Sequence, residues 1–322
     1  MNAVTARAGA NIALVKYWGK RDPNLNLPAA GSLSITLGEL ETVTRIEMDA
    51  GLASDAFELD GQACDAAPIS AVLDLLRPAG APRCRVVSRN NFPTGAGLAS
   101  SASGNAALVV AAAALFRPEL GRAELSALAR RGSGSAARSL FGGFCEMDAG
   151  VAEDGSDCRA RGLQDASYWP LEVVVAITDT GPKAVSSRDG MNRTMATSPY
   201  YPAWVASVPA DLERASQAIA ARDFGELAAV SEHSALKMHA SALAARPGLL
   251  YWNGATVACL ERIRAMRDEG VGVFFTVDAG PQVKAVCRPG ESQRVAAALE
   301  ALPGVQRVLC SGLGAGAHLI AS

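Results

Sequence analysis

The 322-residue sequence lacks the features of several protein classes. Its seven cysteines are scattered singly, with no Cys-x-x-Cys pair and no metal-ligand spacing with the three histidines. We therefore expect buried thiols in a reducing compartment. No apolar signal-peptide core is present, and the longest alanine and valine run, residues 106–116, is far shorter than the about 20 apolar residues that span a bilayer. These absences predict a cytoplasmic protein without a membrane partner.

An excess of charge of one sign is also missing. The 30 lysines and arginines nearly balance the 32 acidic residues, for a formal net charge of −2, which argues against a nucleic-acid or membrane-surface footprint. The sequence has no internal repeat or low-complexity tail. Hydrophobic residues make up 49% and charged residues 19%, as in ordinary globular proteins. A chain of this length exceeds the usual size of one compact core, so we expect two domains.

The sequence contains both strand and helix patterns, which predicts an α+β fold. Residues 32–37 and 42–47 alternate as strands do, and an Asp-Gly pair at 60–61 predicts a hairpin. After a buried strand over residues 171–178, the sequence pattern changes from mostly strand to mostly helix. This change places the domain boundary near residue 179 and predicts domains at 1–179 and 180–322. Helical spacing follows over residues 200–221, 224–244 and 252–267. The chain ends with strand, helix and strand patterns, typical of a split βαβ unit, over residues 283–287, 292–302 and 305–309.

A glycine- and serine-rich loop separates a strand-like run at 84–88 from an alanine-rich helical run at 105–116. At a helix N-terminus, amide groups without intrahelical partners and the aligned peptide dipoles attract anions. Gly95 and Gly97 let the backbone approach a ligand closely. Three hydroxyls are available to cap the helix or to bind oxygen ligands or a metal, those of Ser100, Ser101 and Ser103. The loop predicts a phosphate site, although a plain turn with a serine cap has the same pattern and the Walker motif is absent.

Three further segments carry candidate site residues. Lys16 and Lys20, with Tyr17 between them, are either a snorkelling surface pair or ammonium donors for an anionic ligand. A basic glycine-serine stretch at 130–139 contains three arginines and is either a surface turn or a second anion loop. Asp278 ends an apolar strand just before a Gly-Pro turn. Beside a phosphate loop, such a carboxylate is a turn former or the group that orients an attacking hydroxyl.

The residue patterns of these segments resemble those of a known family. Residues 93–102 resemble the ATP loop of the small-molecule kinases that include galactokinase, homoserine kinase and mevalonate kinase. Segments from four parts of the chain closely resemble, in order, the signature segments of the diphosphomevalonate decarboxylase family: residues 11–22, 91–103, 130–139 and 275–281. Residues 183–191 are similar to its substrate loop. The resemblance implies a two-domain GHMP-kinase fold, with an N-terminal domain like domain 2 of ribosomal protein S5 and a ferredoxin-like C-terminal domain.

The resemblance also implies a reaction. It is the ATP-dependent decarboxylation of mevalonate 5-diphosphate to isopentenyl diphosphate, which releases ADP, phosphate and carbon dioxide in the mevalonate pathway of isoprenoid biosynthesis. The tertiary 3-hydroxyl is a poor leaving group, so its transient phosphorylation makes a group whose departure draws electrons from the breaking carbon-carbon bond. ATP and Mg²⁺ are the implied cofactors, and a homodimer is the usual assembly for the resemblance.

The resemblance further assigns roles to individual residues. Asp278 orients the 3-hydroxyl or accepts its proton, Lys16 lies at the reacting centre, and Arg138 contacts the substrate carboxylate. Residues assigned to the substrate and its diphosphate are Tyr17, Lys20, Ser133, Gly134, Ser135, Ser187, Arg188 and Met191. Residues assigned to ATP, with Ser101 also a candidate Mg²⁺ ligand, are Pro93, Gly95, Gly97, Leu98, Ser100, Ser101, Ser103 and Lys183.

Two departures from the family pattern keep alternatives open. Ala30 and Gly31 replace a usual Asn-Ser, which can shift rate, affinity or preferred substrate, and Gln282 replaces a usual Asn. The nearest alternative is a mevalonate 5-phosphate decarboxylase or a mevalonate 3-kinase. A second is a non-catalytic nucleotide- or metabolite-sensing protein on the same fold, which the presence of Asp278 disfavours. The full decarboxylase is favoured by the combined presence of Lys16, Lys20, Ser133, Arg138, Arg188 and Asp278.

Overall fold

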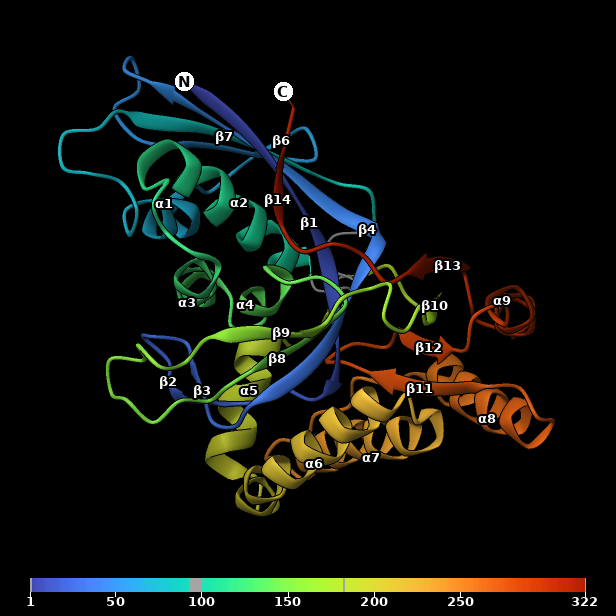
Figure 1. The fold of residues 1–322 in the computed structure, drawn as a ribbon. Helices are drawn as coiled ribbons and strands as arrows, with labels where there is room; N and C mark the ends of the chain where they lie inside the picture. The colour runs from blue at the N-terminus through green and yellow to red at the C-terminus, as the bar shows by residue number, and fades with distance from the viewer. Residues whose placement is uncertain (1, 93–99, 182, 322) are drawn as a thin grey trace.

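The computed structural model describes residues 2–92, 100–181 and 183–321. Two main sheets organise this part of the chain (Figure 1). Helices pack against both sheets, and the segments near the two chain ends pair with each other at one edge of the first sheet (Figure 1). The architecture is α+β, as the sequence predicts.

The first sheet is built around two long strands, β1 (Ala3–Val15) and β4 (Ser32–Asp49), which pair antiparallel over most of their length. The alternating runs at 32–37 and 42–47 both lie within this one strand, β4, which pairs with β8 at its start and with β7 farther along. The path through the sheet is β14-β1-β4-β7-β5-β6. Its other strands are β5 (Ala56–Leu59), β6 (Gln62–Cys64), β7 (Arg83–Asn90), β8 (Phe144–Met147), β9 (Ala160–Gln164) and β14 (His318–Ile320).

The predicted hairpin at Asp60 and Gly61 is confirmed. Strands β5 and β6 pair antiparallel on either side of it, and both turn residues have positive φ, 51° and 82°. These are the dihedral signs that a two-residue hairpin turn requires. Among the described residues of the first sheet, β5 and β7 form the only parallel strand pair.

Four helices pack against the first sheet: α1 (Ala67–Leu73), α2 (Ser100–Phe116), α3 (Arg122–Gly132) and α4 (Ala136–Ser139). Helix α2 is rich in alanine, a strong helix former, and six of its alanines are buried against the strands and neighbouring helices. Small side chains let this helix lie close to β1 and β4. The predicted strand, loop and helix order is confirmed at its two ends by β7 and α2.

The second sheet has four antiparallel strands in the order β11-β12-β10-β13. They are β10 (Glu172–Ile177), β11 (Val273–Val277), β12 (Val283–Cys287) and β13 (Arg307–Gly312). Read in chain order, this arrangement is second, third, first, fourth, which is the ferredoxin-like split βαβ topology that the sequence predicts. Strand β10 is buried on both faces: Val173 and Val175 enter one core cluster, and Val174 and Ala176 another.

Five helices belong to this part of the chain: α5 (Ser187–Thr197), α6 (Tyr201–Ala221), α7 (Phe224–Leu243), α8 (Gly254–Asp268) and α9 (Ser292–Glu300). Helices α6 and α7 lie side by side, and α7 also packs on β1 and β11. Helices α8 and α9 cover the opposite face of the second sheet. The three helices predicted from apolar spacing are confirmed, with α7 capped by Asp223 and α8 by Asn253. No helix in the described ranges is both long and apolar enough to cross a membrane.

The sheets divide the chain less simply than the predicted boundary at residue 179. Strand β10 precedes that boundary but pairs with β12 and β13 of the second sheet. Strand β14 comes near the end of the chain but pairs with β1 of the first sheet. The division into domains 1–179 and 180–322 stays a prediction, and we propose that the second unit begins before β10. A small hairpin of β2 (Lys20–Asp22) and β3 (Leu27–Pro28) follows the end of β1.

Candidate active site

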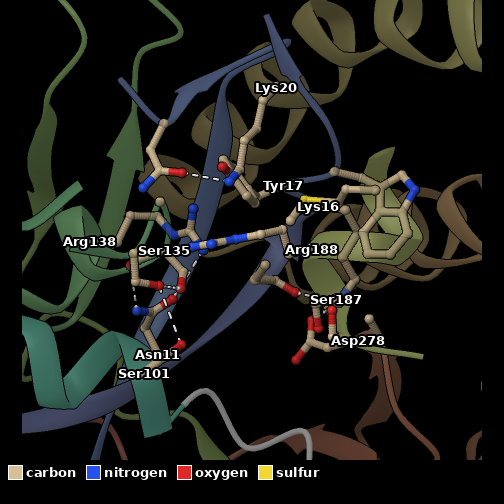
Figure 2. Close-up of a pocket in the computed structure, with 18 of the residues that line it drawn as sticks. Asn11, Lys16, Tyr17, Lys20, Ser101, Ser135, Arg138, Ser187, Arg188 and Asp278 are labelled. Atoms are coloured by element: carbon tan, nitrogen blue, oxygen red, sulfur yellow. Dashed lines mark hydrogen bonds and ion pairs between the residues drawn. The ribbon is translucent and has the colours of Figure 1, made fainter. Parts of the chain in front are cut away.

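A cavity of about 560 Å³ lies beyond the end of β1 and is lined by residues from both halves of the chain (Figure 2). Most of the sequence-predicted site residues line it, namely Lys16, Tyr17, Lys20, Ser100, Ser101, Ser133, Gly134, Ser135, Arg138, Lys183, Ser187, Arg188, Met191 and Asp278. In Figure 2, Asp278 and Ser187 lie on one side of the cavity, and Arg138, Ser135 and Asn11 on the other. Four predicted ATP-loop residues lie outside the described residues: Pro93, Gly95, Gly97 and Leu98.

Lys16 and Asp278 form the centre of this site. The ammonium nitrogen of Lys16, in the first residue after β1, lies 2.6 Å from Oδ1 of Asp278, the first residue after β11. The same nitrogen donates to the carbonyl of Ala13 at 2.9 Å, and the backbone N–H of Lys16 donates to Ser234 on α7. The lysine side chain is 2% exposed, whereas the carboxylate side chain is 26% exposed. The carboxylate is therefore the accessible partner.

A second lysine, which sequence reasoning missed, completes this centre. Nζ of Lys284, the second residue of β12, lies 3.1 Å from Oδ2 of Asp278. Lys284 is 1% exposed. In the sequence it stands inside an apolar strand pattern, and the signal that identifies it is a charged residue at a position that should be buried. A buried ammonium of this kind requires a nearby anion.

The two lysines shift the acid-base behaviour of the site. Burial alone would raise the pKa of Asp278, but the charges and hydrogen bonds of Lys16 and Lys284 outweigh burial and hold that pKa well below its usual range. Burial lowers the pKa of Lys16 to about 8, against the opposing effect of Asp278. Asp278 is therefore an ionised carboxylate at neutral pH, which suits it better to orienting a hydroxyl than to removing a proton from a free one.

Arg138 lies across the cavity on the short helix α4 and is 2% exposed. Its guanidinium donates to the hydroxyl of Ser32 at 2.5 Å and to Oδ1 of Asn11 at 3.1 Å. Its Nε has no partner within the described residues. Asn11 in turn donates to the backbone carbonyl of Ser135 at 2.9 Å and to Ser139 at 2.8 Å. Asn11, named in the sequence only as the start of a family segment, thus links β1 to the arginine.

The glycine-serine segment before α4 faces the end of helix α2. The hydroxyl of Ser133 lies 3.3 Å from that of Ser101 and 3.3 Å from that of Ser135. Gly134 packs under the ring of Tyr17, whose buried hydroxyl has no partner among the described residues. A buried hydroxyl and a row of serine hydroxyls with few protein partners are suited to an oxygen-rich ligand.

The remaining basic residues surround the same space. Lys20 is 5% exposed and donates to Oδ1 of Asn26 at 2.5 Å, and Asn26 also donates to the carbonyl of Arg131. Burial, and then the charge of Arg188, lower the pKa of Lys20. Lys183 donates to Ser187 at 3.1 Å. Among the described lining residues, five basic side chains face one carboxylate, so the cavity attracts anions while the whole chain stays near neutral.

A second cavity, of about 220 Å³, opens beside the start of α2. Ser100 and Ser101 line both cavities, and the rest of the second is mostly apolar, including Phe57, Ile69 and Val86. Ser103 lines neither cavity. It is fully buried, and its hydroxyl lies 2.6 Å from that of Thr42, because its position on α2 points it at the sheet. Its predicted role with ATP phosphates has no support from this geometry.

The described residues contain no group of three or more His, Cys, Asp or Glu side chains able to hold a metal ion. A metal here would depend on oxygen ligands supplied by the nucleotide. Ser101, at the junction of the two cavities, has a hydroxyl whose one described side-chain partner, Ser133, lies at a long 3.3 Å. A hard cation such as Mg²⁺, which keeps several waters and binds through substrate phosphates, fits that setting.

The residues that depart from the family pattern, Ala30, Gly31 and Gln282, lie in different surroundings. Ala30 and Gly31 lie outside the cavity lining, and a β-carbon on Gly31 would be 2.7 Å from Cδ1 of Leu212, so the glycine accommodates packing against α6. Gln282 is fully buried. Its Oε1 accepts from the N–H of Thr178 at 2.7 Å, and its amide donates to the carbonyl of Asp179. The glutamine thus fastens the end of β10 to the turn after Asp278.

Family comparisons agree with this site. Residues 8–160 match the diphosphomevalonate decarboxylase-like N-terminal domain, and residues 173–310 match the mevalonate 5-diphosphate decarboxylase C-terminal domain. The diphosphomevalonate decarboxylase of Candida albicans is 36% identical over 300 residues, covering 87% of this chain and 83% of that protein. The enzyme of that name from Saccharomyces cerevisiae is 38% identical over 297 residues, covering 85% and 75%.

Solved structures agree as well. The mevalonate diphosphate decarboxylase of Staphylococcus aureus superposes with a TM-score of 0.93 at 34% identity, covering 99% of this chain and 98% of that one. A structure described as MDDEF in complex with MVAPP, AMPPCP and magnesium superposes with a TM-score of 0.92 at 36% identity, covering 100% and 99%. Sequence, fold and site geometry together establish that this chain belongs to the diphosphomevalonate decarboxylase family.

Proposed function

We propose that this protein catalyses the ATP-dependent decarboxylation of mevalonate 5-diphosphate to isopentenyl diphosphate, with release of ADP, phosphate and carbon dioxide. The observation that carries the proposal is the gathering of Lys16, Arg138 and Asp278 around one cavity rich in basic side chains. These three residues come from three separate segments of the chain. The family membership and the MVAPP and AMPPCP ligands of a solved relative support the same reaction.

The first step is transfer of the γ-phosphoryl group of ATP to the 3-hydroxyl of the substrate. The ionised carboxylate of Asp278 accepts a hydrogen bond from that hydroxyl and turns its oxygen toward the phosphorus. As the new O–P bond forms, the bond from phosphorus to ADP breaks, and the hydroxyl proton passes to an oxygen of the transferred phosphoryl group. Lys16 lies 2.6 Å from the same carboxylate, so its ammonium stands where negative charge collects as the phosphoryl group is transferred. Both groups are fixed by neighbours before the substrate arrives.

The second step breaks two bonds. The C–O bond to the new phosphate breaks, and electrons from the bond to the carboxylate carbon form the double bond as carbon dioxide leaves. We assign Arg138 to the substrate carboxylate, because its planar guanidinium matches a carboxylate and its Nε has no partner within the described chain. Asn11 and Ser32 hold that guanidinium in place.

The rest of the cavity is assigned to binding the diphosphate group of the substrate. We assign its binding to the ring and basic groups around Tyr17, together with the glycine-serine segment and the start of α5: Tyr17, Lys20, Ser133, Gly134, Ser135, Ser187, Arg188 and Met191. The hydrogen bond between Ser133 and Ser135 and the positive charge of Lys20 and Arg188 in the cavity lining support this assignment. The two cations of this set, Lys20 on β2 and Arg188 on α5, come from different segments of the chain and line the same cavity.

We place the nucleotide across the start of α2. The largely apolar second cavity suits the base and sugar, and Ser100 and Ser101 stand where the two cavities meet, which suits the phosphates. Lys183, whose pKa is lowered by burial, is assigned to the γ-phosphate side. When bound, Mg²⁺ neutralises phosphate charge, with Ser101 the candidate protein ligand. The AMPPCP and magnesium of the solved relative support this pairing.

We further propose a cytoplasmic homodimer. The scattered free cysteines suit a reducing compartment, and five of the seven are buried. The assembly is inferred from the family alone. Size-exclusion chromatography with light scattering tests it, and a monomer at every concentration would refute it.

An assay with three substrates tests the function. Purified protein is given ATP and Mg²⁺ with mevalonate, its 5-phosphate or its 5-diphosphate, and ADP and carbon dioxide are measured separately. We expect both products, in equal amounts, with the 5-diphosphate only. Carbon dioxide from the 5-phosphate, or ADP without carbon dioxide from any of the three, would favour the less phosphorylated alternatives, which the comparisons do not favour.

Asp278→Asn provides the matched control. It removes the charge but keeps the shape of the side chain, so we expect loss of turnover by roughly 10³-fold or more while nucleotide binding persists. Full turnover in this variant would instead revive the interpretation as a sensing protein.

A further inference from the structure

Lys284 is a charged residue at a position where the fold otherwise places apolar side chains. Along β12, Val283, Ala285 and Cys287 face the core beneath α8 and α9, whereas Val286 faces the core shared with β1 and α7. Side chains alternate along a strand, so Lys284 shares the face of Val286. That face is the one toward the end of β1, where Lys16 stands.

The cross-strand neighbours of Lys284 support this placement. It pairs with Thr276 on β11 and with Val175 on β10, so it lies in the centre of the second sheet. The hydroxyl of Thr276 donates to the carbonyl of Ala13 at 3.1 Å, the same carbonyl that accepts from Lys16. The ends of β1 and β11 are thus tied together, and the two lysines approach Asp278 from different segments, Lys16 from just after β1 and Lys284 from β12.

The two ammonium groups bind different oxygens of one carboxylate. Lys16 lies 2.6 Å from Oδ1 and Lys284 lies 3.1 Å from Oδ2 of Asp278. With one oxygen anchored, a carboxylate still rotates about its terminal bond; with both anchored, its plane is fixed. Each oxygen retains a further lone pair for a ligand on the open side. That open side is the cavity, because the carboxylate is 26% exposed while both lysines are at most 2% exposed.

We propose that Lys284 is a positioning residue for the reaction, which together with Lys16 clamps the carboxylate of Asp278 in the orientation that directs the 3-hydroxyl of the substrate. This inference rests on the proposed function. Lys284 does not line the cavity and so acts through Asp278. A stabilising role alone accounts poorly for the lysine, because an apolar residue of similar volume in a sheet core is usually as stable as a buried ion pair.

The other charged and titratable groups near the carboxylate do not replace the clamp. His239 on α7 has its pKa lowered to about 3 by burial and by the lysines, so it is neutral near pH 7. Its Nε2 lies 3.3 Å from the carbonyl of Val277. Arg138 on α4 and Lys183 before α5 act on the site through their charge, without a hydrogen bond to the carboxylate among the described contacts.

Lys284→Met, close in length but without charge, tests the proposal in the full-length protein. We expect kcat for mevalonate 5-diphosphate to fall roughly 100-fold, the scale typical of a misplaced reacting group, while KM for both substrates stays near its wild-type value. With one ammonium gone, the carboxyl pKa of Asp278 rises, so the acidic limb of the kcat profile moves to higher pH. Lys284→Arg restores the charge and should recover part of kcat.

A second readout is independent of turnover. Carboxyl ¹³C NMR of labelled protein, with the Asp278 resonance assigned by its loss in Asp278→Asn, follows the titration directly. We expect a higher midpoint in Lys284→Met than in the wild type. If the wild type fails to turn over mevalonate 5-diphosphate, the proposed function fails, yet this measurement still decides whether Lys284 holds the carboxylate.

Lys237→Met is the matched control. Its ammonium lies 2.6 Å from Oδ2 of Asp211, a largely buried ion pair on α6 and α7 outside the cavity. We expect it to cost thermal stability but to leave kcat and the pH profile unchanged. The proposal is overturned if Lys284→Met keeps wild-type kcat, if its Asp278 titration is unchanged, or if both methionine variants lose kcat equally in step with their loss of stability.

Discussion

The ring of Tyr17 lies so close to Gly134 that a β-carbon on that glycine would be 2.2 Å from the phenolic oxygen. The contact joins the segment after β1 to the glycine-serine segment before α4. A larger residue at this position would force the ring of Tyr17 to move, because its β-carbon would overlap the phenolic oxygen. The position of the tyrosine hydroxyl in the cavity therefore depends on the absence of a side chain at residue 134.

Gly134→Ala should displace Tyr17 and weaken substrate binding. We expect KM for mevalonate 5-diphosphate to rise about tenfold, with little change in the Kd of ATP, since the nucleotide is assigned to the other side of the site. Steady-state kinetics and nucleotide titration measure the two. Gly254→Ala, at a helix start with nothing within 4 Å of the added carbon, is the control and should behave as wild type. An unchanged KM in Gly134→Ala would contradict this role for the contact.

Turnover should depend on the protonation of Lys16. Burial lowers the pKa of Lys16 to about 8, and Asp278 partly opposes that decrease. The charged form predominates below that pKa, so kcat/KM, which reports the free enzyme, should fall as pH rises through about 8. Bound anionic substrate favours the ammonium, so kcat should hold to higher pH.

Two variants check this assignment through pH profiles of kcat/KM. Lys16→Arg should lack the basic limb, because arginine stays protonated. Asp278→Asn removes the anion that supports the ammonium. The basic limb of any residual activity should therefore lie at a lower pH than in the wild type. A basic limb that stays near pH 8 in Lys16→Arg would show that another group titrates there.

Asn11 should affect turnover by holding Arg138 in position. Its Oδ1 accepts from the guanidinium at 3.1 Å, and its amide donates to Ser135 and Ser139. Asn11→Ala frees the arginine and removes these links, so we expect kcat to fall roughly 10-fold to 100-fold with the Kd of ATP nearly constant. Ser139→Ala, which removes one of the links but keeps the guanidinium contact, should lose much less. Equal losses in the two variants would indicate a general packing effect.

Gln282 should contribute stability. Without its side chain, the buried N–H of Thr178 loses its described acceptor, which costs roughly 1–3 kcal/mol. We expect Gln282→Ala to lower the free energy of unfolding by that amount, measured by urea denaturation of the whole chain. Gln62→Ala, at an exposed position on β6, is the control and should stay within about 0.5 kcal/mol of wild type. A stable Gln282→Ala would mean that the turn finds another partner for Thr178.

Local patterns identified most of the elements correctly. The hairpin at Asp60 and Gly61 follows from turn chemistry between two adjacent residues, and the long helices follow from apolar spacing over a few turns. Sheet membership did not follow, because it depends on pairing between distant segments. Strand β10 bonds to strands more than 100 residues away, and β14 returns to β1 at the other end of the chain.

The candidate site was also predictable from the sequence only in part. The sequence motifs identified Lys16, Arg138 and Asp278, since those residue types in those segments match the family pattern. It did not point to Lys284, whose importance comes only from the face of β12 that it occupies. Ser103 shows the converse, since its hydroxyl belongs to a motif but turns into the sheet toward Thr42.

The sequence by itself determined which residue types this protein has available: a carboxylate at a strand end, basic residues beside glycine-serine loops, and elements whose local periodicity forms helices and strands. Only the tertiary structure decided which of them meet. Asp278 acquires its low pKa and its fixed plane from Lys16, 262 residues before it just after β1, and from Lys284, 6 residues after it on β12. Burial and long-range strand pairing, which set these distances, are properties of the folded chain.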